Sequence, residues 1–207
     1  NEPYEFKFEL IENKTVKKQM ETKPILSYLF FEGDKIIIDE MSPKEKFGKF
    51  MNNETKLRSQ SMGKSLVSYV LGHAICEGYI ESIDSKISDW NLVKDTLYEN
   101  HSLIDILNMA SGDQKYVHDS AAIVNGKVSA DYRGSGTDID STDVKTNLLL
   151  YFKNKSPLKK KYNYNVMNTN LILNYVSFKT GDDFQKILDK TFKEKAKIKN
   201  SVIFWKV

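Results

Sequence analysis

Ser61 and Lys64 have the residue types and the spacing of a catalytic pair. They stand three positions apart in Ser61-Met62-Gly63-Lys64, at the start of a run with helical periodicity. Residues three apart on a helix lie on the same face, about one turn from each other. A serine hydroxyl needs a base to become a nucleophile, and a lysine can act as that base when burial or a cationic neighbour favours its neutral form. The spacing therefore predicts Ser61 as nucleophile and Lys64 as base.

The same spacing occurs once more, at Ser156-Pro157-Leu158-Lys159, and lysine is common enough here for such matches to arise by chance. Context separates the two. Ser61 leads into an apolar helical stripe, so its hydroxyl would lie at the positive end of a helix dipole, which favours a developing oxyanion. Ser156 is followed by proline and lysines, without an apolar stripe to hold its geometry. We therefore assign the chemistry to Ser61.

Histidine and metal chemistry have weaker support. His73 lies twelve residues after Ser61, roughly 18 Å along the same helix, which is out of reach. His101 is expected to face solvent, and His118 lies in a loop region where its position cannot be predicted. No zinc or calcium motif occurs, and the single Cys76 excludes an internal disulfide and is expected in the core. We expect neither a metal nor a cofactor.

Tyr164 is the second candidate for proton transfer. It lies in Tyr162-Asn163-Tyr164-Asn165-Val166, just before a predicted helix. A nearby ammonium would lower the pKa of a phenol enough to exchange protons with Ser61 or with a leaving group. A tyrosine at such a position is more often a packing residue, so the residues alone leave both roles open.

Composition and charge limit the other classes of function. The chain has 207 residues and a net charge of +3, which is too small to argue for nucleic acid. The basic run Lys159-Lys160-Lys161 is expected to be a solvated loop. No apolar stretch reaches the roughly 18 residues of a membrane span. Because the chain starts at Asn1 and stops in an apolar cluster at Val207, we expect a fragment of a longer protein, and its compartment and oligomeric state stay open.

Strand signals come first in the chain and helix signals follow. Alternation predicts a strand over residues 4–10, and β-rich runs predict a hairpin over 25–31 and 35–40 that turns at Gly33. Apolar periodicity and terminal glycines predict helices over 60–78, 102–111 and 168–179, with a fourth after Asp182. Residues 113–147 read as long loops with one short helix at most. We expect strands of an α/β part over residues 1–58, and a catalytic helix with a helical subdomain over 59–207.

Three blocks in this order resemble the serine β-lactamase and penicillin-binding superfamily. The likeness is closer to its β-lactamase-related branch of class C-like enzymes, family VIII-type esterases and 6-aminohexanoate-oligomer hydrolases. It covers nearly the whole chain, and the blocks are specific only together. They are Leu57–Ser65, Ser102–Gly112, and Tyr162-Asn163-Tyr164-Asn165 with Leu171-Ile172-Leu173 and Thr180-Gly181.

The resemblance implies roles for three residues and a fold. Ser61 would be acylated, Lys64 would be its base and Tyr164 would relay a proton, while the backbone N–H of Ser61 would form half of an oxyanion hole. The implied fold is α+β and β-lactamase/transpeptidase-like: an antiparallel sheet flanked by helices, plus a helical subdomain. The site would lie between the two, with loops 113–140 over its mouth and Tyr116 and Tyr132 in its wall.

Two positions depart from the family pattern. Val166 stands where the family often has asparagine or serine, which removes an amide that could bind a substrate carbonyl. Lys179-Thr180-Gly181 spells the family's K-T-G motif, but it fits a helix closed by glycine rather than a strand. The true strand is therefore expected beyond Val207. The sheet would then be incomplete at its C-terminal side, and the isolated fragment is expected to be inactive.

These observations predict a serine hydrolase that cleaves an ester or amide bond of a small molecule through an acyl-enzyme on Ser61. The expected likeness is to an esterase or a 6-aminohexanoate-oligomer hydrolase. A β-lactamase or a penicillin-binding D,D-peptidase acting on a β-lactam-like substrate is the alternative within the enzymes. A homologue that binds peptides or cell-wall fragments without catalysis is the alternative from another class.

Overall fold

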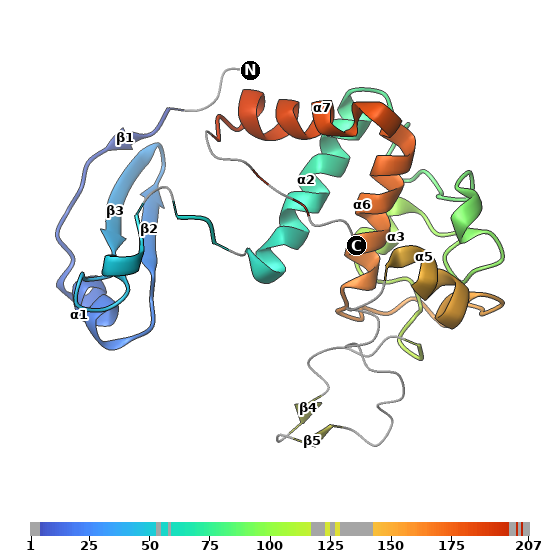
Figure 1. The fold of residues 1–207 in the computed structure, drawn as a ribbon, viewed down its shortest axis with the longest axis horizontal. Coiled ribbons are helices and arrows are strands. Elements are labelled where there is room, and N and C mark those ends of the chain that lie inside the picture. The colour runs from blue at the N-terminus through green and yellow to red at the C-terminus, as the bar shows by residue number, and fades with distance from the viewer. Residues whose placement is uncertain are drawn as a thin grey trace. The chain divides into compact units, whose positions relative to one another are not determined.

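A computed structural model gives the fold and divides the chain into two compact units, Asn1–Arg58 and Ser59–Val207 (Figure 1). It describes residues 5–52, 55–57, 59–116, 123–124, 127–128, 143–198, 202 and 204.

The first unit contains a three-stranded sheet in the order β1-β3-β2. Strands β2 (Ser27–Glu32) and β3 (Lys35–Met41) form the predicted antiparallel hairpin, and Gly33 makes its turn at φ +60°. Strand β1 (Lys7–Phe8) pairs with β3 in parallel, so the sheet is mixed and not antiparallel throughout. The expectation of an antiparallel sheet is wrong here because a helix separates β1 from the hairpin, which lets β1 run in the same direction as β3.

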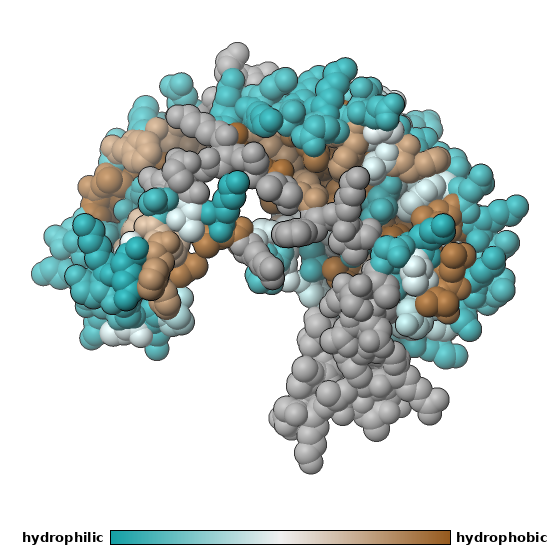
Figure 2. All heavy atoms as spheres, viewed as in Figure 1, coloured by the Kyte–Doolittle hydropathy of each residue, from teal (hydrophilic) through white to brown (hydrophobic). Residues whose placement is uncertain are grey.

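That helix, α1 (Lys14–Thr22), was not predicted, because only two of its residues face a core. Asn13 caps it by accepting a hydrogen bond from the Val16 backbone N–H at 3.0 Å. Val16 and Met20, one turn apart, pack with Ile38 of β3 in a small buried cluster. The side chains of β2 are exposed along the whole strand, and apolar surface is visible over this unit (Figure 2).

The second unit is largely helical and holds the main core. Its elements are α2 (Gly63–Cys76), α3 (Leu103–Leu107), the short strands β4 (Ile123–Val124) and β5 (Lys127–Val128), α5 (Val144–Asn147), α6 (Met167–Thr180) and α7 (Phe184–Asp189). Helices α5 and α7 continue as π-helical turns over Leu148–Phe152 and Lys190–Lys195. Together with the sheet of the first unit, these elements confirm the α+β class.

Helix α2 packs against α6, and α3 and α7 also contact this pair (Figure 1). The side chains between them are fully buried, including Val70, Leu71 and Ala74 of α2 and Leu171 and Val176 of α6. The apolar periodicity that predicted α2 and α6 is therefore the packing surface of the unit. None of the helices in the described part of the chain is long and apolar enough to cross a membrane.

The ends of the helices differ in how well they were predicted. Helix α6 stops at Gly181, with φ +53°, so Lys179-Thr180-Gly181 is the end of a helix as expected. Ser102 caps α3 as predicted, but the helix ends at Leu107 rather than Ser111, because Met109 adopts φ +51° and turns the chain away.

Cys76 is exposed, so its predicted place in the core is wrong. It follows Tyr69 and Gly72 along a face of α2 whose side chains are exposed, whereas the apolar stripe of the helix lies on another side.

Candidate active site

Ser61 lies in a 3₁₀ turn, Gln60–Met62, directly before α2, and its side chain is exposed. The turn is closed by a hydrogen bond from the Met62 N–H to the Ser59 carbonyl at 3.1 Å. Gln60 has φ +49°, a region that few residues other than glycine adopt, and such strain costs of order 1–3 kcal/mol. A sharp, strained turn thus presents the Ser61 hydroxyl at the N-terminal end of a fourteen-residue helix.

Lys64 lies in the first turn of α2 and is half-buried. Its ammonium nitrogen lies 4.9 Å from the centroid of the Tyr164 ring, so the two side chains form a cation–π contact. Such contacts stabilise by about 0.5–2 kcal/mol, depending on how far the cation is desolvated. The structure therefore brings together two of the three predicted catalytic residues. Among the residues that are described, no hydrogen bond joins Ser61 to either of them.

A cavity of about 190 Å³ opens beside Lys64, between α2, α3 and α6. Its apolar side chains come from all three helices or their ends, and its polar ones come from α2 and α6. The lining residues are Lys64, Ser65, Val67, Ser68, Ile106, Leu107, Met109, Thr169 and Ile172. Five of the nine lining side chains are apolar, and the cavity is smaller than the roughly 300–1,000 Å³ of typical small-molecule sites.

The segment that carries Tyr164 alternates between buried and half-buried side chains. Asn163 and Asn165 are buried, and Tyr164 between them is half-buried. Successive side chains of an extended segment point to opposite sides. The Asn163 N–H also donates to the Met109 carbonyl at 2.8 Å, which attaches the segment to the end of α3. The two asparagines therefore face the interior, and Tyr164 faces Lys64.

Asp113 accepts hydrogen bonds from four neutral side chains, although it is fully buried. Its Oδ1 accepts from Asn163 Nδ2 at 3.1 Å. Its Oδ2 accepts from the Tyr98 hydroxyl at 2.9 Å, from Asn168 Nδ2 at 3.0 Å and from Asn165 Nδ2 at 3.2 Å. Burial and the neighbouring carboxylate hold the pKa of Tyr98 well above its ordinary value, so its hydroxyl remains a donor. The carboxylate thus joins the end of α3, the core and the segment around Tyr164.

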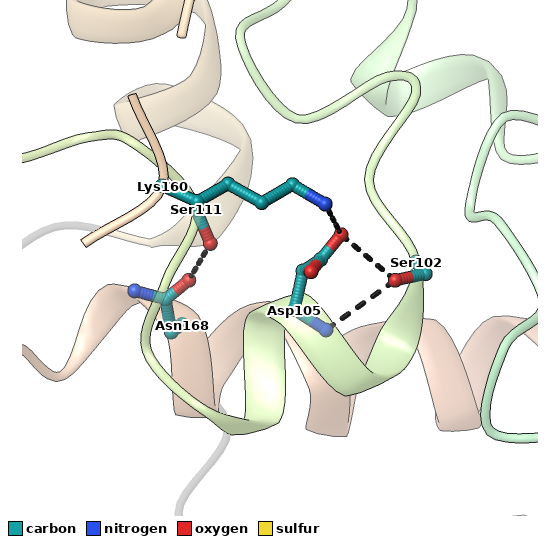
Figure 3. A network of polar contacts seen from close by, with 5 residues as sticks. All are labelled: Ser102, Asp105, Ser111, Lys160 and Asn168. Carbon is teal, nitrogen blue, oxygen red and sulfur yellow. Dashed lines mark hydrogen bonds and ion pairs between the residues drawn. The ribbon is translucent and has the colours of Figure 1, made fainter. Parts of the chain in front are cut away.

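Further polar contacts join α3 and the chain after it to the segments on either side of Tyr164 (Figure 3). Ser111 donates to Asn168 Oδ1 at the start of α6. Lys160 and Ser102 donate to Asp105 Oδ2 at 2.6 and 2.8 Å. Burial raises the pKa of Asp105, but the hydrogen bonds from Lys160 and Ser102, together with the nearby positive charge, bring the pKa below its ordinary value. The Lys160–Asp105 ion pair therefore attaches the chain before Tyr164 to α3.

The structure places the other predicted residues away from this contact. Tyr116 is partly buried against the main core, and its backbone N–H donates to the Asp113 carbonyl at 2.7 Å. It is not among the residues that line the cavity beside Lys64. Tyr132 and His118 lie outside the described residues.

His101 does not face solvent as expected, because it is only 6 % exposed. Its carbonyl accepts from the Ile87 N–H at 3.2 Å, and this pairing draws residue 101 inward, where its ring meets Tyr98 edge-on. Burial lowers the pKa of His101, and Nδ1 has no hydrogen-bond partner within the described chain. His73 is half-buried in α2 with its ring edge-on to Tyr69.

Sequence reasoning missed Asp113 and the asparagines around it. The only signal was the alternation of Asn163 and Asn165 about Tyr164, which is typical of an extended segment with one polar buried side. Within the described ranges, no group of three or more histidine, cysteine, aspartate or glutamate side chains is placed to hold a metal ion.

No protein-family model matches this chain, and no curated protein matches it either.

Proposed function

We propose that this chain carries the nucleophile and the base of a serine hydrolase that cleaves an ester or amide bond through an acyl-enzyme on Ser61. The observation that supports this proposal best is the contact between Lys64 and Tyr164, which are 100 residues apart in the chain. Packing alone does not require a lysine on this tyrosine. A base and a proton relay in one site would account for this contact, which joins Lys64 Nζ to the Tyr164 ring.

The chemistry follows from the roles of the three side chains. Ser61 Oγ attacks the carbonyl carbon of the substrate while its proton passes to Lys64 Nζ, a step that requires Lys64 as the neutral amine rather than as the ammonium. The tetrahedral intermediate collapses with loss of the leaving group, which takes a proton through the Tyr164 hydroxyl. Water then attacks the acyl-serine, which releases the carboxylic acid and restores the Ser61 hydroxyl. The N-terminal end of α2 favours the oxyanion in both steps.

The cavity beside Lys64 offers room for a small substrate group next to the candidate base, and Ser61 and Tyr164 are not among its lining residues. Its apolar lining would hold a hydrocarbon portion, and Ser65, Ser68 and Thr169 offer hydroxyl groups. Val166 offers no amide to a substrate carbonyl, which favours a simple ester or amide over a β-lactam.

Labelling of the nucleophile tests the proposal. The full-length protein, with any segment that follows Val207, is treated with a fluorophosphonate and with a fluorescent penicillin. We expect Ser61→Ala to abolish labelling and Ser156→Ala to retain it. Ser156 is the matched control because it has the same spacing to a lysine and lies in an exposed segment. Equal labelling of the two variants would refute Ser61 as the nucleophile.

Turnover then separates the alternatives. Hydrolysis of p-nitrophenyl esters or aminohexanoate oligomers supports the proposed function, and hydrolysis of nitrocefin favours the β-lactamase alternative. Binding of peptides or cell-wall fragments without acylation favours the non-catalytic alternative.

A further inference from the structure

The full burial of Asp113 has no explanation in packing alone. A buried carboxylate costs several kcal/mol unless hydrogen bonds replace its hydration. Here four neutral donors do so, and none of the ion pairs formed within the described ranges involves Asp113. Apolar side chains of similar volume would fill the same space at lower cost. This favours a role for the carboxylate in orienting the tyrosine and asparagine side chains that donate to it.

Two of those four groups flank Tyr164 in the chain. Asn163 and Asn165 are its two chain neighbours, and each donates to a different oxygen of Asp113. Asn165 Nδ2 also donates to the Asn163 carbonyl at 2.8 Å, which closes a small ring of hydrogen bonds behind the tyrosine. Because both neighbours are held on one side, the Tyr164 ring is directed to the other side, where Lys64 lies.

The far side of the carboxylate is fixed to the core. Tyr98 is fully buried and donates its hydroxyl to Oδ2. Asn168, in the first turn of α6, donates to the same oxygen, and its Oδ1 accepts from Ser111. The position of Asp113 is thus set by α6, by the end of α3 and by the main core.

We propose that Asp113 is a positioning residue that sets the Tyr164 ring on the Lys64 ammonium by holding both neighbours of Tyr164. Its consequence for catalysis rests on the proposed function, whereas its effect on the Lys64–Tyr164 contact does not. A carboxylate suits this task because two oxygens can accept all four donors. An asparagine at position 113 has one acceptor oxygen, and its NH₂ group would face at least one of the donors.

The test compares three variants. Asp113→Asn removes an acceptor with little change of shape. Asn163→Ala removes the side-chain donor to Oδ1, and it decides the question alone if Asp113→Asn does not fold. Tyr98→Phe is the control, because it removes one donor to Asp113 but leaves both neighbours of Tyr164 attached.

The first measurement does not depend on activity. The ring current of Tyr164 shifts the NMR resonances of the Lys64 side-chain protons. These resonances are assigned in protein with isotope-labelled lysine, because they disappear in Lys64→Arg. A Tyr164→Leu variant defines the position without a ring. We expect Asp113→Asn and Asn163→Ala to shift the resonance towards the Tyr164→Leu position and Tyr98→Phe to leave it at the wild-type position. A wild-type position in Asn163→Ala and in any folded Asp113→Asn would overturn the proposal, as would an equal shift in Tyr98→Phe.

The second measurement is the rate of Ser61 acylation as a function of pH in the full-length protein. A displacement of a proton-transfer group by about 1 Å costs on the order of 100-fold in rate. We expect a 10–100-fold loss in Asp113→Asn and less than threefold in Tyr98→Phe. If wild-type protein is not acylated, the proposed function fails, and the resonance of Lys64 still decides the role of Asp113. Equal rate losses in Asp113→Asn and Tyr98→Phe would show that Asp113 has no specific role in catalysis.

Discussion

Replacement of Gly112 by alanine perturbs the point where the segment before Tyr164 crosses the end of α3. Gly112 has φ +68°, which L side chains rarely adopt. A Cβ atom there would lie 2.3 Å from the Leu158 carbonyl oxygen and 2.9 Å from the Leu158 nitrogen. Both atoms belong to the backbone, so the overlap can be relieved only by moving the chain that leads to Tyr164.

The expected cost comes from two sources. A non-glycine residue in the left-handed region costs about 1–2 kcal/mol. Moving Leu158 breaks the hydrogen bond from its N–H to the Gly112 carbonyl, which is 2.8 Å long and contributes about 1 kcal/mol. We therefore expect Gly112→Ala to lower the free energy of unfolding by about 2–3 kcal/mol, from the two effects together.

Urea unfolding followed by far-UV circular dichroism measures this change, with Gly72→Ala as the matched control. Gly72 lies inside α2, and a Cβ atom there meets nothing within 4 Å. Alanine at that position is expected to stabilise the protein by about 0.5–1 kcal/mol. The reasoning is refuted if Gly112→Ala costs less than about 1 kcal/mol, the lower limit for a left-handed non-glycine residue, or if both variants change stability in the same direction.

Two further predictions concern the same unit. Asp105→Asn should destabilise by about 0.5–1 kcal/mol at pH 7, because it removes the ion pair to the largely exposed Lys160. The pKa of Asp105 is lower in the folded protein than in the unfolded chain, so its contribution is present above the unfolded value of about 3.9 and is lost as pH falls through the folded value. Urea unfolding from pH 7 towards pH 3 should show the difference shrink, and a constant difference would contradict this. Leu71→Ala should cost about 2–5 kcal/mol because Leu71 is fully buried, while Leu150→Ala, 67 % exposed, should change stability by less than about 1 kcal/mol.

Local signals in the sequence predicted the elements whose formation depends on residues close together in the chain. Helices α2 and α6 follow from apolar periodicity, and Gly181 ends α6 because glycine adopts the backbone angles of that position at little cost. Gly33 marks the turn of the hairpin for the same reason. Helix α1 was missed because only Val16 and Met20 are buried in it, and two apolar residues are too few for a periodic signal.

Side-chain burial was predicted less well where it depends on neighbours distant in the chain. Cys76 is apolar and lies in a helix, yet the face of α2 on which it stands is exposed. His101 is polar and lies before a helix cap, yet its pairing with Ile87 draws it inside. In both residues the type suggested one environment and the packing of other segments decided another.

The candidate site also combines features that local sequence predicts with contacts that only the tertiary structure shows. The sequence by itself predicted that Ser61 and Lys64 lie about one turn apart, because a spacing of three in a helical segment is a local property of the backbone. In the structure the pair spans the 3₁₀ turn Gln60–Met62 and the first turn of α2. Only the tertiary structure decided that Tyr164 meets Lys64, and that Asp113 collects Tyr98, Asn163, Asn165 and Asn168. These contacts join residues that are 15 to 100 positions apart, and no local preference of the chain specifies them. They exist because the packing of α2, α3 and α6 brings their ends together and leaves one buried carboxylate to satisfy the polar groups that meet there.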